Sequence, residues 1–350
     1  MEKTDIKSLY FDELTEYVMS MGLPEFRATQ LYDWMHVKLA DRYESMTNIP
    51  VRLREQLKEN TDYTSLKIVR KQVSAIDGTS KYLFELEDGN LIESVLMHYH
   101  HGNTVCISSQ AGCRMGCRFC ASTLDGLARS LKPSEMLDQI YRIQAETGER
   151  VDNVVVMGSG EPFDNFDNFL RFAKLLNDPR GLNISARNLT VSTCGIVPEI
   201  YKFADLKLQI TLAISLHAPN DDMRRKLMPI ACRYSIRELM DACRYYIDKT
   251  GKRITFEYSL VKDENDTDEC AEQLINLVKG MNCHINLIPV NPVKERGFRQ
   301  SGLDRITKFK NKLEKNRINV TIRRELGRDI DGACGQLRKR YSDEHLKEQT

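Results

Sequence analysis

The stretch that decides the fold is Cys113-Arg-Met-Gly-Cys117-Arg-Phe-Cys120, whose spacings of four and three residues gather three thiols in one short loop. A structural zinc site takes four protein ligands in a closed tetrahedron, and ordinary iron–sulfur electron carriers hold their cluster with four cysteines. Three thiolates on a cubane leave one iron open to a small molecule. The spacing therefore predicts a 4Fe–4S cluster with one open iron.

Two other interpretations of the loop are weaker. A zinc knuckle would need a distant histidine such as His98 or His217, and the next histidine after Cys120 is His217. A disulfide cluster is disfavoured because the chain begins Met-Glu-Lys-Thr-Asp, without an apolar signal segment or a long apolar run. These features predict a cytoplasmic protein with no membrane association, in a compartment where disulfides rarely persist. Ten cysteines in 350 residues are also too dilute for a disulfide scaffold.

The composition is that of a globular chain with one large domain and one or two small ones, since 41% of its 350 residues are hydrophobic and 29% are charged. The net charge of +1 says nothing about an anionic partner, but positive charge gathers near the end. From Lys294 to Arg340 there are 15 Lys and Arg residues against 6 Asp and Glu residues. Some of these lysines fit a solvated helix face. The arginines and the lysine that bracket Cys334 favour contact with a phosphate backbone: Arg323, Arg324, Arg328, Arg338, Lys339 and Arg340.

Two small segments precede the main body. Apolar residues at helical spacing predict helices through residues 1–62, a small accessory domain. Residues 63–100 change to period two, with strands expected over 65–75, 79–86 and 91–99. Asp77-Gly78 and Asp88-Gly89 are the turn dipeptides of tight hairpins, so this segment is predicted to be a β-meander extension.

Residues 101–340 alternate strand and helix, and residues 341–350 are predicted to be a polar tail. This alternation indicates a parallel sheet with crossover helices, an α/β fold that we expect to be a partial, TIM-like (β/α)6 barrel. The three cysteines follow its first strand, at the end where such barrels carry function. The predicted strands are 104–109, 153–157, 189–193, 209–216, 253–261, 284–290 and 318–323, and the predicted helices include 133–146, 164–176, 236–250, 268–281 and 302–316.

Over nearly its whole length the chain resembles the RlmN/Cfr group of radical-SAM RNA methyltransferases. The resemblance rests on the cysteine loop and on an ordered series of short motifs. They include Cys106-Ile-Ser-Ser-Gln-Ala-Gly-Cys113, Met157-Gly-Ser-Gly-Glu-Pro162, Ser215-Leu-His217, Lys226-Leu-Met-Pro229 and Asp329-Ile-Asp-Gly-Ala-Cys-Gly-Gln-Leu337. The resemblance implies a radical-SAM barrel with one 4Fe–4S cluster on Cys113, Cys117 and Cys120, and two molecules of S-adenosylmethionine (SAM) consumed per turnover.

The same resemblance implies roles for individual residues. Cys334 would carry the methyl group as S-methylcysteine, Cys106 would release the product through a transient disulfide, and Glu93 would remove the ring proton. The residues expected to bind SAM are Gly160, Glu161, Ser192, Ser215, Leu216, His217 and Asn291. For Phe119, packing on the cofactor's adenine and packing inside the loop are equally compatible with the sequence.

The function that the resemblance implies is formation of 2-methyladenosine in 23S rRNA near the peptidyl-transferase centre and in tRNA beside the anticodon. The alternative inside the group is methylation of adenine carbon 8 in 23S rRNA, as in Cfr-type enzymes that confer antibiotic resistance. A rival of another class is a non-catalytic RNA-binding or zinc-binding protein. The expected partners are 23S rRNA, tRNA and an external one-electron reductant such as flavodoxin, and the expected oligomeric state is a monomer.

Overall fold

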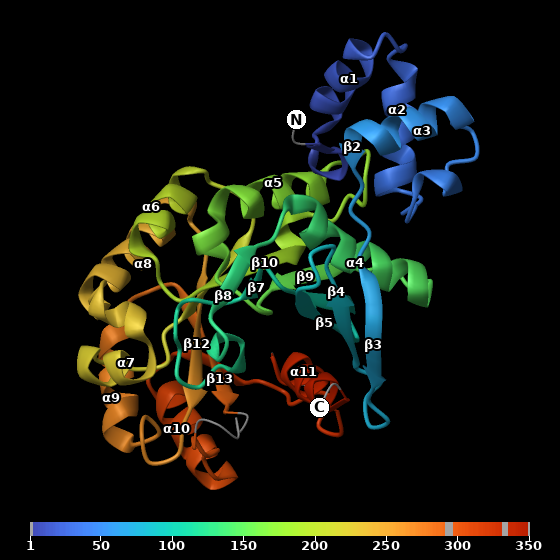
Figure 1. Cartoon of the computed structure of the whole chain (residues 1–350). Coiled ribbons are helices and arrows are strands. Elements are labelled where there is room, and N and C mark those ends of the chain that lie inside the picture. Colours follow the sequence, from blue (N-terminus) through green and yellow to red (C-terminus); the bar gives the residue numbers. More distant parts are fainter. Residues whose placement is uncertain (1–2, 291–296, 331–334, 349–350) are drawn as a thin grey trace.

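The N-terminal segment is a small helical unit with its own core. Its helices α1 (Phe11–Ser20), α2 (Phe26–His36) and α3 (Val51–Asn60) confirm the predicted pattern, and their buried faces pack together. A short parallel pair, β1 (Thr4–Asp5) with β2 (Thr61–Asp62), joins the two ends of this unit. It stands at one end of the molecule beside α4 and α5 (Figure 1). The computed structural model describes residues 3–290, 297–330 and 335–348.

One ten-stranded sheet forms the main body, in the order β14-β13-β12-β11-β10-β9-β6-β5-β4-β3. Within this sheet β6, β9, β10, β11, β12, β13 and β14 are parallel to one another. Strands β5, β4 and β3 continue the sheet as an antiparallel meander. Within the described residues β14 pairs only with β13, so the barrel stays open, as predicted. The strands are β3 (Lys67–Val73), β4 (Ser80–Glu85), β5 (Leu91–Tyr99), β6 (Gly102–Ile107), β9 (Asn153–Val156), β10 (Leu189–Thr193), β11 (Thr211–Ser215), β12 (Ile254–Leu260), β13 (Cys283–Pro289) and β14 (Asn319–Ile322).

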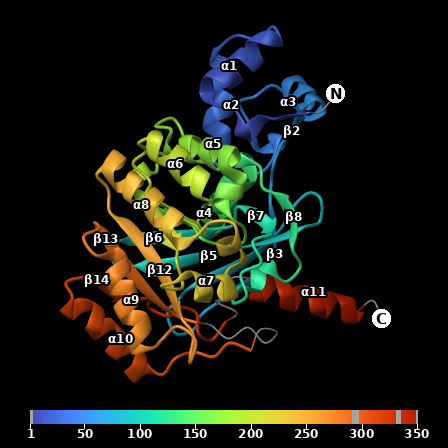
Figure 2. The same ribbon diagram turned by 90° about the vertical axis from the view of Figure 1, so that its left-hand side faces the viewer.

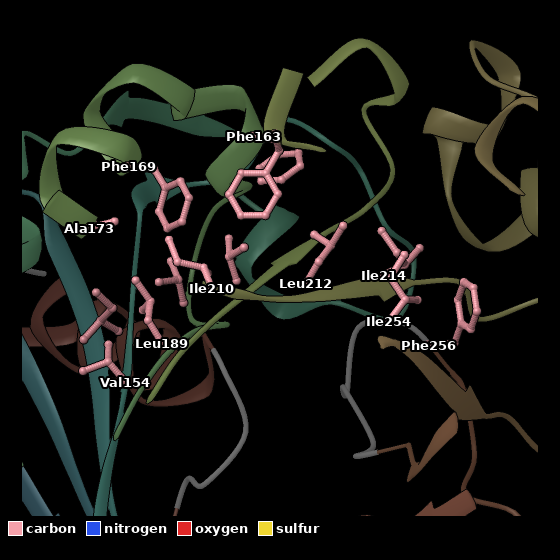
Figure 3. Close-up of a cluster of buried hydrophobic side chains, with 14 of the residues drawn as sticks. Val154, Phe163, Phe169, Ala173, Leu189, Ile210, Leu212, Ile214, Ile254 and Phe256 are labelled. Carbon is pink, nitrogen blue, oxygen red and sulfur yellow. The ribbon is translucent and has the colours of Figure 1, made fainter. Parts of the chain in front are cut away.

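Helices follow the strands and cover the outer face of the sheet (Figures 1 and 2). Between them and the strands lies the main core, where Val154, Leu189 and Leu212 meet Phe163 and Phe169 (Figure 3). The helices are α4 (Pro133–Thr147), α5 (Phe166–Asn177), α6 (Val197–Asp205), α7 (Asp221–Leu227), α8 (Ile236–Thr250), α9 (Asp268–Val278) and α10 (Leu303–Lys315). Of these, α6 and α7 are not among the helices expected from the sequence.

The opposite, inner face of the sheet is polar. Successive side chains of a strand point to opposite faces, so the burial of Ile254, Phe256 and Tyr258 in the outer core directs Glu257 of β12 inward. Strand pairing then aligns one polar row across the inner face, at the carboxyl-terminal half of the strands. Its members are Ser215, Glu257, Asn286 and Thr321.

Two further elements frame the inner face. A small hairpin of β7 (Gln110–Gly112) and β8 (Leu127–Ser130) follows β6, and helix α11 (Gln336–Glu348) lies against β5. The boundary predicted at residue 340 falls inside α11. No helix among the described residues is both long and apolar enough to cross a bilayer. Short 3-10 helices complete the fold: η1 (Ile6–Ser8), η2 (Tyr43–Ser45), η3 (Ala121–Thr123), η4 (Pro162–Asn165), η5 (Ala186–Asn188) and η6 (Pro229–Cys232).

Candidate active site

The β7–β8 hairpin fixes the two ends of the cysteine loop. The amide of Cys113 donates a 2.8 Å hydrogen bond to the carbonyl of Gly126. Gly112, with φ of +80°, lies so close that a Cβ there would stand 2.0 Å from the same carbonyl oxygen, so only glycine fits. Cys113 and Cys117 are buried, and Cys120 is half-buried.

The donor set suits an iron–sulfur cluster. Burial raises the pKa of the Cys113 thiol to about 12 and raises that of Cys117 as well, and negative charge on neighbouring thiols raises both further. The thiols therefore need a cationic centre to become thiolates. No three His, Cys, Asp or Glu side chains within the described part of the chain are arranged around a single metal ion. A cubane places each thiolate on a different iron, so it does not require such convergence.

Gly160 and Glu161 follow β9 and bridge to the neighbouring strands. The amide of Glu161 donates to Gln110, whereas its carboxylate accepts bonds from the amides of Phe163 at 3.0 Å and Cys194 at 2.7 Å. Burial raises the pKa of Glu161, although these amide donors act in the opposite direction. Gly160, with φ of +106°, packs on Gln110, where a Cβ would approach to 2.6 Å. Glu161 is thus held beside the cysteine loop, and its negative charge helps to raise the pKa of the Cys113 and Cys117 thiols.

The ends of β10 and β11 supply the next predicted residues. The hydroxyls of Ser192 and Ser215 lie 3.4 Å apart, and Leu216 is fully buried with its amide donating to the carbonyl of Glu257. His217 has φ of +54°, and its Nδ1 accepts the amide of Ser259 at 2.9 Å. Burial lowers the pKa of His217 to about 3, so its imidazole is neutral.

The aromatic residue of the loop joins these two regions. The ring of Phe119 meets that of His217 edge to face, with centroids 4.7 Å apart. Nδ1 of His217 accepts an amide proton, so its neutral ring carries its proton on Nε2 and offers no lone pair to a metal. His98 lies opposite Asn103 at the amino-terminal end of β6, away from the cysteine loop, so neither histidine is placed as a zinc ligand.

Glu93 lies at the carboxyl-terminal edge of the sheet and holds the start of α11. Its Oε2 accepts the amide of Gly335 at 2.5 Å, and its Oε1 accepts the amide of Arg338 at 2.7 Å. The ammonium of Lys81 lies 3.1 Å from Oε2, with both side chains almost fully buried. Gly335 also packs against the end of the cysteine loop, where a Cβ would stand 2.9 Å from the amide of Ser122. Three segments far apart in sequence therefore meet at Gly335.

The same C-terminal segment is anchored a second time on the meander. The carboxylate of Asp329 accepts bonds from the hydroxyl of Ser74 at 2.6 Å and the amide of Ala75 at 2.7 Å, and Asp77 accepts the amide of Gly327 at 3.0 Å. The chain is thus held on both sides of Cys334, by the β3–β4 turn before it and by Glu93 of β5 after it. Cys334 itself and Asn291 lie outside the described residues.

Cys106 shares the inner face with Glu93. It lies on β6 directly opposite Val95 of β5, which points to the same side of the sheet as Glu93 two positions earlier. Cys106 is buried, with 7% of its surface exposed. The structure thus brings together the loop cysteines, Glu161, His217, Ser192, Ser215, Glu93 and Cys106 at one edge of the open barrel.

Residues 107–278 match the Radical SAM superfamily, and residues 4–62 match the Ribosomal RNA large subunit methyltransferase N-terminal domain. A protein of Lachnospira eligens named "Probable dual-specificity RNA methyltransferase RlmN" is 69% identical over 97% of both chains. One of the same name from Lachnoclostridium phytofermentans is 57% identical over 99% of this chain and 97% of its own. The chain belongs to the RlmN family.

A solved member of the same fold agrees with this assignment. The crystal structure of a radical SAM methyltransferase from Sphaerobacter thermophilus superimposes with a TM-score of 0.91 at 43% identity, covering 95% of this chain and 98% of the other. The predicted fold class is therefore confirmed for this RlmN-family chain. As a radical-SAM protein it uses a 4Fe–4S cluster and SAM.

One buried residue of this RlmN-family site escaped the sequence reasoning. Arg224 of α7 is fully buried behind the cysteine loop and donates to the carbonyls of Cys194, Ser215 and Leu216. Its Nη1 has no acceptor in the described structure. Such an orphaned buried donor near the thiols of Cys117 and Cys194 fits the presence of an anionic group there.

The Lys81–Glu93 pair gives a first prediction. We expect Lys81→Met to lower the free energy of unfolding by about 3–5 kcal/mol, because it leaves the carboxylate of Glu93 buried without its counter-ion. The matched control is Lys71→Met on the neighbouring strand β3, since the Lys71–Glu146 pair is 31% and 37% exposed and should cost no more than about 1 kcal/mol. Urea unfolding measures both. An equal decrease in the free energy of unfolding of the two variants would contradict the conclusion that Lys81 stabilises the fold as the buried counter-ion of Glu93.

Proposed function

We propose that this chain is a dual-specificity RNA methyltransferase that forms 2-methyladenosine in 23S rRNA near the peptidyl-transferase centre and in tRNA beside the anticodon. The observation that carries the proposal is the meeting of Glu93, Gly335 and the end of the cysteine loop at Ser122. It joins a buried carboxylate, the segment that contains Cys334 and the loop of three cysteines. The proteins named RlmN in other bacteria support the dual specificity.

In this proposal Cys113, Cys117 and Cys120 hold the cluster. Together, the cluster and two molecules of SAM supply a methyl group and a 5′-deoxyadenosyl radical. Glu161, oriented by two backbone amides and by Gln110, accepts hydrogen bonds from the amino group of SAM. The remaining proposed contacts at the same edge of the sheet are Gly160, Ser192, Ser215, Leu216 and His217. Asn291, which lies outside the described residues, is proposed as a further contact.

The other steps belong to three residues of this chain. Cys334 takes up the methyl group and presents it to the adenine, and Glu93, oriented by Lys81 and two amides, accepts the ring proton. Cys106 then attacks the sulfur of Cys334 as a thiolate. The S–S bond forms as the bond from that sulfur to the transferred carbon breaks, and this carbon leaves with the electron pair and takes up a proton to become the methyl group of the product. The shared face of Glu93 and Cys106 supports this division. An external one-electron reductant such as flavodoxin, and a monomeric enzyme, complete the proposal.

The test is the RNA of a strain that lacks this protein. Nucleosides from its 23S rRNA and tRNA, separated and weighed by mass spectrometry, should lack 2-methyladenosine, and plasmid-borne wild-type protein should restore it in both RNAs. Restoration in rRNA alone would contradict the dual specificity. Appearance of 8-methyladenosine would instead assign the chain to the carbon-8 alternative, and unchanged RNA would refute the proposal.

Contact with the RNA backbone gives a second prediction. Arg338 forms a 3.0 Å ion pair with Asp125 and is only 13% exposed, whereas Arg323 and Arg324 are exposed just after β14. Replacing both of these arginines by methionine should weaken RNA binding and flatten its log–log salt dependence by about 0.7 per lost phosphate contact. The control is Lys308→Met with Lys312→Met, because these lysines already pair with Asp268 and Glu272. Filter binding over a salt series measures the affinity and the slope of both variants. An unchanged slope in the arginine variant would mean that Arg323 and Arg324 do not contact the RNA backbone.

A further inference from the structure

Arg224 occupies an unusual position for a charged residue. It lies on α7 with none of its surface exposed, and its guanidinium reaches the ends of two strands. Nη2 donates to the carbonyl of Cys194 at 2.6 Å and to that of Ser215 at 3.4 Å, and Nε donates to that of Leu216 at 3.3 Å. Gly195, with φ of +101°, makes room for it, because a Cβ there would stand 3.2 Å from Nη2. Backbone carbonyls thus fix the orientation of the guanidinium.

The positive charge of Arg224 has no carboxylate within 4.0 Å as an ion-pair partner among the described residues, although Asp221 on the same helix adds negative charge nearby. Its Nη1 lacks any acceptor. A buried cation without a partner costs several kcal/mol, so such groups are retained where an anion compensates them. The orphaned nitrogen therefore indicates an anion that the folded polypeptide does not itself provide.

The cysteine loop packs next to α7 and is one source of such an anion. The amide of Arg118 donates a 2.9 Å bond to the carbonyl of Leu227, at the end of α7, and Cys117 packs against Leu227 and Met228. Nη2 of Arg224 donates to the carbonyl of Cys194, and Cys194 packs in the same cluster as Cys117. Helix α7 therefore packs against the loop, and Arg224 is connected to Cys117 through Cys194.

We propose that Arg224 is the fixed counter-ion of the iron–sulfur cluster and sets its reduction potential. This inference rests on the proposed function, since it requires the cluster on Cys113, Cys117 and Cys120. Reduction adds one electron from the external reductant, and the added negative charge is stabilised by a cation fixed in buried surroundings. Arg224 thereby makes the cluster easier to reduce. It is a positioning residue, because it acts through Cys117 and not on the substrate.

The test is an anaerobic redox titration of the full-length, reconstituted protein, followed by the electron paramagnetic resonance of the reduced cluster. In Arg224→Met we expect the equilibrium for reduction to be about tenfold less favourable, which lowers the midpoint potential by about 59 mV for one electron. Arg224→Lys keeps the charge and should shift less. The matched control is Arg225→Met, the next residue on α7, whose side chain is 47% exposed and pairs with Asp222. The cluster of this control variant should have the same midpoint potential as that of the wild type.

Each outcome decides the proposal. Arg224→Met with full iron and sulfide and an unchanged midpoint would overturn it. If that variant takes up no cluster, circular dichroism and thermal melting show whether the cluster-free protein is folded. A folded chain supports the counter-ion role. An unfolded chain means that Arg224 is needed for folding, and it overturns the proposal. Failure of the proposed function is a different result, because the wild-type protein itself would then lack a cluster or leave RNA unmethylated.

Discussion

Replacing Cys113, Cys117 and Cys120 by alanine, singly or together, is expected to abolish the broad iron–sulfur absorbance and all cleavage of SAM. Each thiolate would hold a different iron, so losing one removes a ligand that the buried loop cannot replace. The high pKa that burial gives Cys113, about 12, means that the thiols are of little use as ligands without the cationic cluster. Iron and sulfide analysis of anaerobically purified protein, with 5′-deoxyadenosine measured by chromatography, would show both losses.

The matched control is Cys232→Ala. This cysteine ends η6 close in sequence to α7, but it is exposed, and it belongs to neither the loop nor the inner face. The variant should keep wild-type iron, absorbance and turnover. A triple-alanine protein that still methylates RNA would exclude the radical mechanism altogether, whereas a triple variant that lacks iron but still binds RNA would separate the cluster from substrate binding.

The parts of this fold that local sequence determines were predictable. Period-two patterns with Asp77-Gly78 and Asp88-Gly89 gave the meander, because both glycines adopt the left-handed φ that tight turns need. The parallel strands followed from short apolar runs between amphipathic helices, and β12 and β13 differ from their predicted ranges by only a residue at their ends. The predicted positions of the loop cysteines, Glu161 and His217 at one edge followed from the topology of parallel sheets.

What could not be predicted depends on contacts between distant residues. Lys81 is a charged residue that sequence reasoning expects at the surface, yet it is buried against Glu93, and Glu93 binds a segment 242 residues further along the chain. Arg224 has the same character, since its role depends on carbonyls of β10 and β11 that approach only in the folded state. Helix α7, which is short and rich in charge, gives too weak a periodic signal to predict.

The different roles proposed for Cys334 and Cys106 predict opposite amounts of covalent RNA adduct in the two alanine variants. We expect Cys334→Ala to contain no methylated cysteine and to form no covalent RNA adduct, because the proposed methyl carrier is gone. Cys106→Ala should still be methylated on Cys334 and should then stall with RNA attached, because no thiolate is available to release it. Both variants should be inactive in turnover but opposite in adduct formation. Denaturing gels of each protein purified from cells, with and without nuclease, would reveal the adduct.

Two further variants make this experiment decisive. Cys106→Ala with Cys334→Ala should behave like Cys334→Ala, because an adduct cannot form without the carrier. Cys243→Ala is the control for removing a buried thiol, since Cys243 packs in the outer core among α8 residues and should leave both turnover and adduct formation unchanged. Glu93 and Cys106 share the inner face beside the anchored C-terminal segment, which is the geometry that release of an adduct on Cys334 requires. An adduct in Cys334→Ala, or none in a Cys106→Ala protein whose Cys334 is methylated, would mean that the two roles are assigned wrongly.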